Sequence, residues 1–201
     1  MTAAAAQLTT TESGSPRQAQ ALFFRSILSF LEERCLLADV VARVSEPTRC
    51  AIRQPPWIGG WIPSLPVDEI EAALQEIGGA EINVDLGRFT ASQMVSSRLT
   101  PILSAIFSVT GRSPEALFRS LNLCFSLATR GISFVYVPAE RGGGVVAHFR
   151  GPGTPEGAFH VLRGALMHAF DVVGTRGTVS EPVKEAEDEQ GVTIRYGVYW
   201  P

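Results

Sequence analysis

The sequence has little charge and no long hydrophobic run. Charged residues make up 18% of the 201 residues, and the formal net charge is −3. A nucleic-acid-binding protein needs a basic surface to displace counterions from phosphates, so this composition argues against a nucleic-acid partner. No apolar stretch reaches the roughly 18 residues that a membrane-spanning helix requires. We therefore expect no integral membrane segment.

Cysteine is also scarce. The three cysteines, Cys35, Cys50 and Cys124, are odd in number and none lies at CxxC spacing, which predicts no disulfide framework and a reducing, cytoplasmic location. Residues 1–16 are small and polar and lack the basic start and apolar middle of an export signal. We interpret 1–16 as a disordered tail and 17–201 as a single α+β domain.

What the sequence does have is enough apolar material for a core. Hydrophobic residues make up 45% of the chain, and the mean hydropathy is +0.15. Low charge combined with this hydropathy indicates that some apolar surface is covered by a ligand, a protein partner or a second copy.

The N-terminal half reads as helical. Apolar residues at helical spacing predict helices over 17–34, 36–45, 65–78, 85–110 and 113–129. Gly78 and Gly79 are expected to end the third helix, and Pro101 to kink or break the fourth. The proline- and glycine-rich stretch 54–66 argues against a regular element there. Hydroxyl–proline steps at residues 15–16, 113–114 and 154–155 predict capped helix starts.

After residue 130 the pattern changes to alternation. Strands are predicted over 132–137, 145–150, 178–184 and 192–200, with a helix over 155–173 between the second and third. The predicted fold class is thus α+β, with a helical N-terminal half packed on a small antiparallel sheet ordered strand–strand–helix–strand–strand.

No catalytic or metal motif stands out. His160 and His168 are eight residues apart, too far for a good metal pair, there is no GxSxG elbow, and Cys124 lies in an apolar stripe. Gly142 to Gly144 separate two strands and read as a hairpin turn rather than a phosphate loop. We predict no cofactor, no metal and no enzyme. The alternative is an enzyme with His148, His160 or His168 as general base, beside Asp171 or Glu156.

The most unusual stretch is PPWIGGWIP, residues 55–63, with two tryptophans in a proline–glycine loop. It is either a ligand or partner surface or a plug over the core. A ligand pocket is expected between this loop, the sheet and the helix 155–173. The expected lining residues are Trp57, Trp61, Phe134, Tyr136, Phe149, Phe159 and Met167.

A resemblance to known proteins covers roughly residues 45–200. It rests on the stretches PPWIGGWIP, GRSPEALFRSL, HFRGPGTPEGAFHVLRGALMHAFDVVGTRGTVS and VTIRYGVYW. The chain resembles the superfamily of haem-nitric-oxide-binding domains, vinyl-reductase-like domains and small subunits of the TRAPP trafficking complex. It is more closely similar to a paralogous family of unknown function that is expanded in myxobacteria.

This resemblance implies a fold used for small-molecule sensing or protein contacts, often as a dimer. The haem domains carry a proximal histidine and a Tyr-x-Ser-x-Arg motif, and the vinyl-reductase-like domains often carry a cysteine cluster. The present sequence has neither the Tyr-x-Ser-x-Arg spacing nor the cluster. The leading hypothesis is a non-enzymatic sensory or protein-interaction module that binds an apolar small molecule or a protein partner as a homodimer. A scaffold subunit of a larger assembly is a further alternative.

Overall fold

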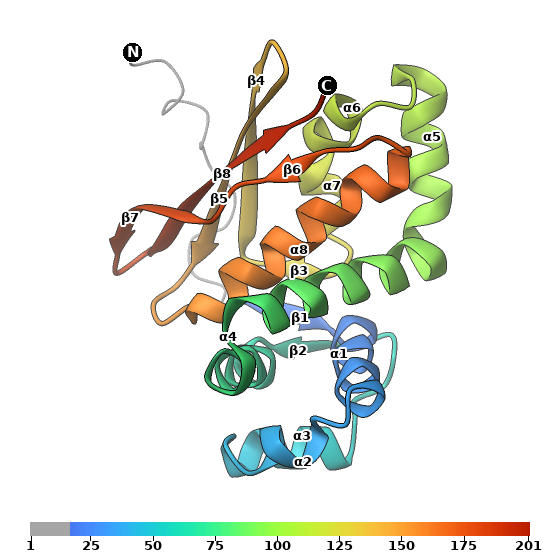
Figure 1. The fold of residues 1–201 in the computed structure, drawn as a ribbon. Coiled ribbons are helices and arrows are strands. Elements are labelled where there is room, and N and C mark those ends of the chain that lie inside the picture. The colour runs from blue at the N-terminus through green and yellow to red at the C-terminus, as the bar shows by residue number, and fades with distance from the viewer. Residues whose placement is uncertain (1–16) are drawn as a thin grey trace.

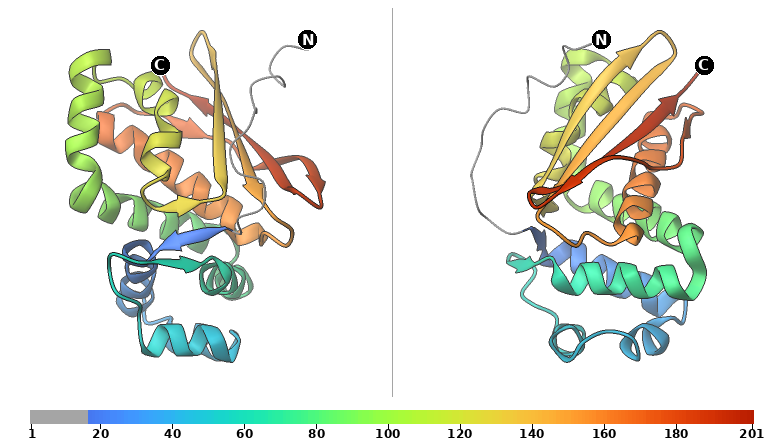
Figure 2. Two further views of the ribbon diagram at one scale, coloured as in Figure 1. Left: turned by 180° about the vertical axis from the view of Figure 1, so that it is seen from behind. Right: turned by 90° about the vertical axis from the view of Figure 1, so that its left-hand side faces the viewer.

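The computed structural model describes residues 17–201, and it has the α+β architecture that the sequence predicts (Figure 1). The predicted tail, 1–16, lies outside the described residues. A twisted antiparallel sheet forms one side of the molecule, a long helix lies across one of its faces, and the N-terminal helices gather at one end (Figure 2).

The C-terminal half confirms the predicted strand–strand–helix–strand–strand order. Its elements are β4 (Ile132–Ala139), β5 (Gly142–Arg150), α8 (Glu156–Val173), β6 (Thr178–Val179), β7 (Val183–Asp188) and β8 (Gly191–Tyr199). The sheet runs β4-β5-β8-β6, and β7 also pairs with β8. One correction concerns the strand predicted over 178–184, which is split into β6 and β7. Pro182, which cannot donate to a ladder, lies in the gap.

The N-terminal half contains a small second sheet that the sequence did not predict. Strand β1 (Gln18–Gln20) pairs antiparallel with β2 (Trp61–Pro63) and β3 (Thr129–Arg130). The first helix therefore begins later than predicted, and the stretch 54–66 is not wholly irregular. The helices around this sheet are α1 (Ala21–Glu33), α2 (Leu37–Val41) and α3 (Glu46–Arg53).

Helix α4 (Leu65–Met94) crosses the predicted stop at Gly78–Gly79. Gly79 adopts φ 69°, ψ −155°, so two helical segments meet there at a kink instead of being separated by a loop. The chain continues through a π-helical turn, η2 (Val95–Leu99), into α5 (Thr100–Thr110). This turn, directly before α5 with Pro101 in its first turn, is the predicted irregularity at that proline.

The helix predicted over 113–129 is two shorter ones, α6 (Pro114–Arg119) and α7 (Leu121–Phe125), separated at Ser120. Ser113 caps α6, since its hydroxyl accepts from the backbone N–H of Ala116 at 3.2 Å, as predicted. The predicted cap at Thr154 is wrong. Its buried hydroxyl has no hydrogen-bond partner within the described residues, and α8 starts without a side-chain cap.

Two hydrophobic cores fill the molecule. The N-terminal core lies among β1, α1–α3 and the first part of α4, and the C-terminal core lies among the end of α4, α5–α8 and the larger sheet. Helices α4 and α8 run side by side where the cores meet (Figure 1). Glycines allow this close approach: a Cβ at Gly87 would lie 1.9 Å from the Val161 carbonyl oxygen, and one at Gly164 would lie 2.0 Å from that of Val84.

None of the described helices combines the length and the apolar character needed to cross a membrane.

Candidate functional site

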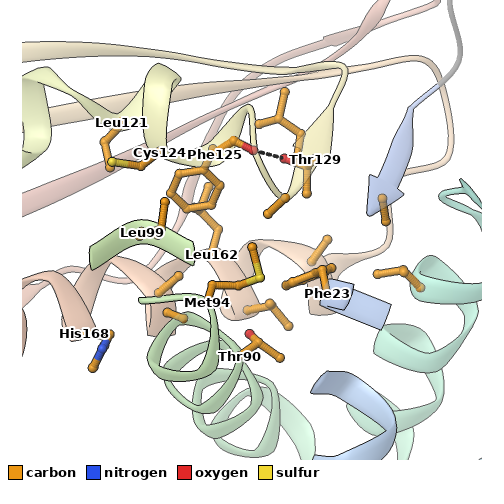
Figure 3. A pocket seen from close by; sticks show the side chains of 18 of the residues that line it. Phe23, Thr90, Met94, Leu99, Leu121, Cys124, Phe125, Thr129, Leu162 and His168 are labelled. Carbon is orange, nitrogen blue, oxygen red and sulfur yellow. Dashed lines mark hydrogen bonds between the residues drawn. The ribbon is translucent and has the colours of Figure 1, made fainter. Parts of the chain in front are cut away.

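A cavity of about 140 Å³ lies between the two cores (Figure 3). Its wall includes three residues of the N-terminal core, Ala19, Val67 and Val161. The lining residues that belong to the C-terminal core are Met94, Leu99, Leu103, Leu117, Leu121, Cys124, Ala128, Phe149, Ala158, Leu162 and Ala169. The space is thus a gap in the packing at the junction of the cores, and its wall is mostly apolar.

Helix α4 provides one polar stripe to this wall. At its N-terminal end the cavity is lined by residues at helical spacing: Ser64, which precedes the helix, then Val67, Asp68 and Glu71. All of these except Val67 are polar. The far end of the same helix contributes Thr90, Ala91 and Met94. The stripe makes the cavity most polar at the end nearest β1, and the rest of the wall is mostly apolar, with Thr90 and His168 as exceptions.

An ion pair closes the polar end. The Arg17 guanidinium donates two hydrogen bonds to the Asp68 carboxylate, at 3.1 and 3.0 Å, and the Ser64 hydroxyl donates a third at 2.8 Å. The two charged side chains are only 9% and 17% exposed. Burial raises the pKa of Asp68, although Arg17 and Ser64 favour its ionised form.

Next to this pair lies Glu71, a buried acid. Glu71 is 4% exposed, and burial raises the pKa of its carboxyl well above the usual value. The neighbouring Asp68 raises it further, and Arg17 opposes the shift. The acid is therefore favoured in its uncharged form, which can donate a hydrogen bond.

Most of the side chains labelled in Figure 3 are apolar. Phe125 and Leu162 lie close together there, and the Met94 thioether lies below them. Burial raises the pKa of the Cys124 thiol to about 11, so the thiol is protonated at neutral pH.

A second cleft, of about 420 Å³, is lined in part by the Arg17–Asp68 ion pair. Its wall includes residues 150–153 and the start of α4, and it shares Arg17, Ser64 and Asp68 with the inner cavity. The ion pair thus forms part of the wall of both spaces.

Of the seven predicted lining residues, Phe149 lines the cavity. Phe134 and Phe159 are buried in the C-terminal core, and Tyr136 and Met167 pack against that core. Neither tryptophan of the loop lines the cavity. Trp57 is 79% exposed, and Trp61 stacks under the guanidinium of Arg130, a residue of the cavity wall, at 4.1 Å.

The sequence prediction placed the pocket between α8, the large sheet and the tryptophan loop, whereas the cavity extends to α1, α4 and α5–α7. It missed Glu71 and the Arg17–Asp68 pair. A signal was present, because Glu71 follows Ile70 and precedes Ala73 and Leu74, all buried positions of one helix. An acid within such a stripe is a candidate for a buried polar role.

The three histidines do not converge. Each has its own polar neighbours. A ring nitrogen of His148 lies 3.1 Å from the Thr193 hydroxyl, and one of His168 lies 3.2 Å from the Asp171 carboxylate. The ring nitrogens of His160 lie 3.8 Å from Glu156 and 3.9 Å from Glu181. His168 is the one that lines the cavity, and Figure 3 shows it at the margin, apart from the central side chains.

No protein-family model matches the chain, and no curated protein matches it. Solved structures do. An unliganded Fe(II) H-NOX protein mutant from K. algicida has a TM-score of 0.65 and 13% identity, over 90% of this chain and 96% of its own. An oxygen-binding H-NOX domain related to soluble guanylate cyclases, in its oxygen complex, has a TM-score of 0.57 and 12% identity, over 90% and 96%.

The fold is H-NOX-like. A third similar structure, described as showing haem redox potential modulated by porphyrin distortion, has a TM-score of 0.62 and 11% identity, over 90% of this chain and 99% of its own. At these identities the likeness extends to the fold, and the site must be judged from its own residues.

Those residues do not fit a haem. A site for a molecule of that size encloses on the order of 300–1,000 Å³, well above the about 140 Å³ of this cavity. Haem iron is bound by His, thiolate, Met or Tyr. Here Cys124 is a protonated thiol, and His168 lies at the margin with one ring nitrogen on Asp171. Met94 also lines the cavity, but a Met ligand in haem proteins acts together with a His, and His168 lies apart from it.

Proposed function

We propose that this chain is a non-enzymatic, sensory ligand-binding module whose ligand is a small apolar molecule held between the two cores. The observation that supports this most is the position of the cavity, whose wall contains Val67 and Val161 of one core and Met94 and Leu162 of the other. A ligand there contacts both halves of the fold, so its binding energy bears on how the halves pack.

The size of the cavity limits the ligand. Engineered apolar cavities of about 150 Å³ stay dry and bind benzene or xenon. A space of about 140 Å³ with a mostly apolar wall suits a ligand of the same class. The H-NOX-like fold supports a sensory role by analogy, since one similar structure is described as an oxygen-binding domain.

No reaction is assigned to the histidine in the wall. The Asp171 carboxylate that contacts His168 also accepts from Arg88 at 3.0 Å, so its charge is already paired. This arrangement favours a structural role for His168 over that of a general base.

The proposal also includes a homodimer or a protein partner, a cytoplasmic location, and membership of the wider superfamily with the vinyl-reductase-like and TRAPP domains. All three cysteines are free, which supports a reducing compartment. Exposed apolar side chains such as Trp57 and Val109 support a partner.

Titration of the purified protein with benzene, followed by calorimetry or NMR, tests the proposal. We expect saturable binding that is lost in Leu162→Phe, because the larger side chain fills the space. Met167→Phe is the matched control: Met167 lies on the same helix but outside the cavity wall, so that variant binds benzene normally. Absence of benzene and xenon binding by the wild-type protein contradicts the proposal.

A further inference from the structure

The polar side chains of the cavity wall differ in whether their hydrogen bonds are made. Arg17, Ser64 and Asp68 bond to one another. The buried Thr90 hydroxyl donates within its own helix, to the Leu86 carbonyl at 2.9 Å or the Gly87 carbonyl at 3.2 Å.

Glu71 differs from these residues. No hydrogen bond joins its carboxyl oxygens to any other residue of the described part of the chain, 17–201, although the side chain is 4% exposed and lines the cavity. Leaving a buried donor unsatisfied costs free energy comparable to a lost hydrogen bond. A group of this kind in a ligand cavity is a place for a ligand atom.

We propose that Glu71 determines ligand specificity, by donating its carboxylic acid O–H to an uncharged acceptor oxygen, such as a carbonyl, on an otherwise apolar ligand. The inference rests on the proposed function and names its ligand class: a small apolar ketone, aldehyde or ester.

The charges around Glu71 favour an uncharged ligand over an ion. A cationic ligand head would lose its hydration beside the Arg17 guanidinium, and an anionic head beside the Asp68 carboxylate. Because Arg17 and Asp68 already neutralise each other, neither is available to pair with an incoming charge. A neutral oxygen needs only the hydrogen bond that Glu71 can supply.

The test compares cyclohexanone with methylenecyclohexane, two molecules of nearly the same shape that differ in one oxygen. We expect the preference of the wild-type protein for cyclohexanone to exceed that of Glu71→Leu by about tenfold, the value of one net hydrogen bond. Glu71→Gln keeps a donor of similar shape and should keep the preference. Glu76→Gln, at an exposed acid of the same helix, is the matched control.

Infrared spectroscopy of bound cyclohexanone gives a second readout. Donation by Glu71 lowers the carbonyl stretching frequency in the wild-type protein, and Glu71→Leu removes that shift. A purely structural role for Glu71 would not produce it.

The outcomes separate the two ideas. Binding of both molecules with the same preference in wild type and Glu71→Leu overturns the role of Glu71 and leaves the proposed function standing. Tighter binding of cyclohexylammonium or cyclohexanecarboxylate than of cyclohexanone overturns the uncharged ligand class. Failure of the wild-type protein to bind either neutral molecule overturns this inference, and failure to bind benzene as well overturns the proposed function with it.

Discussion

The Arg17 guanidinium is bound to the Asp68 carboxylate by two hydrogen bonds, at 3.1 and 3.0 Å, and the pair stands between the inner cavity and the outer cleft. Both side chains are largely buried, so each depends on the other for its charge compensation. The pair joins the start of the first described strand to the first turn of α4, and it fixes the polar end of the cavity.

Arg17→Met should destabilise the protein by about 3 kcal/mol, because it leaves the Asp68 carboxylate buried without its partner. Chemical denaturation measures the loss. Arg34→Met is the control, since the Arg34–Asp85 pair is more than half exposed, and we expect a change within about 0.5 kcal/mol. The double variant Arg17→Met/Asp68→Leu should recover much of the loss, and an additive double variant would argue against this account.

The pH dependence of stability should carry a contribution from Glu71. Its pKa is raised in the folded state, so above pH 4.5, its usual value, the folded protein holds a proton that the unfolded chain releases. This contribution is fully present below that value and is lost as pH rises toward the raised pKa, by up to about 1.4 kcal/mol per pH unit.

Denaturation of the wild type and Glu71→Gln between pH 5 and 8 isolates this contribution. The variant cannot titrate at this position, so its stability relative to wild type should increase with pH. A stability difference that does not change with pH would mean that Glu71 is ionised in the folded protein.

Thiol labelling should distinguish Cys124 from the other cysteines. Cys35 and Cys50 are exposed, whereas Cys124 is buried in the cavity wall with a pKa of about 11. At pH 8 we expect two thiols to react quickly with a disulfide reagent and the third slowly. Cys124→Ser should show only the fast phase. A ligand in the cavity should slow the third thiol further, and three equally fast thiols would show that the wall opens freely.

The contact between α4 and α8 should not tolerate a side chain at Gly164. A Cβ there would lie 2.0 Å from the backbone oxygen of Val84, so Gly164→Ala should cost about 2 kcal/mol or more in thermal or chemical denaturation. In Gly78→Ala, on α4, the new Cβ meets the Ile82 side chain at 3.2 Å, and alanine favours the helix. That control should be near neutral; equal losses in the two variants would contradict the close-packing account.

Local pattern predicted the C-terminal half of the fold well. Alternation in Val192–Trp200 reflects one buried face of the strand, which sequence spacing records directly. Helical spacing in Phe159–Val173 predicted the helix, although its first turns are buried on all sides, His160 included, because α8 also packs against α4. Pairing of Gln18–Gln20 with Trp61–Pro63 depends on partners more than 40 residues away, and three-residue strands carry too little pattern to be seen.

The site was harder to predict than the fold. Aromatic residues were expected to line it because they carry much apolar area, yet Phe134 and Phe159 pack into the core. The cavity is instead defined by where two cores fail to meet, which depends on the whole packing arrangement. Trp57, the most conspicuous residue of the sequence, is 79% exposed and lies outside the cavity wall.

The glycine contacts between α4 and α8 give the cavity one stiff wall and one compliant wall. On the stiff side, backbone meets backbone at Gly87 and Gly164 and cannot yield. On the other side, α5 has a single buried residue, Leu103, and that side chain lines the cavity. We therefore expect an occupant larger than about 140 Å³ to displace α5 before it displaces α8.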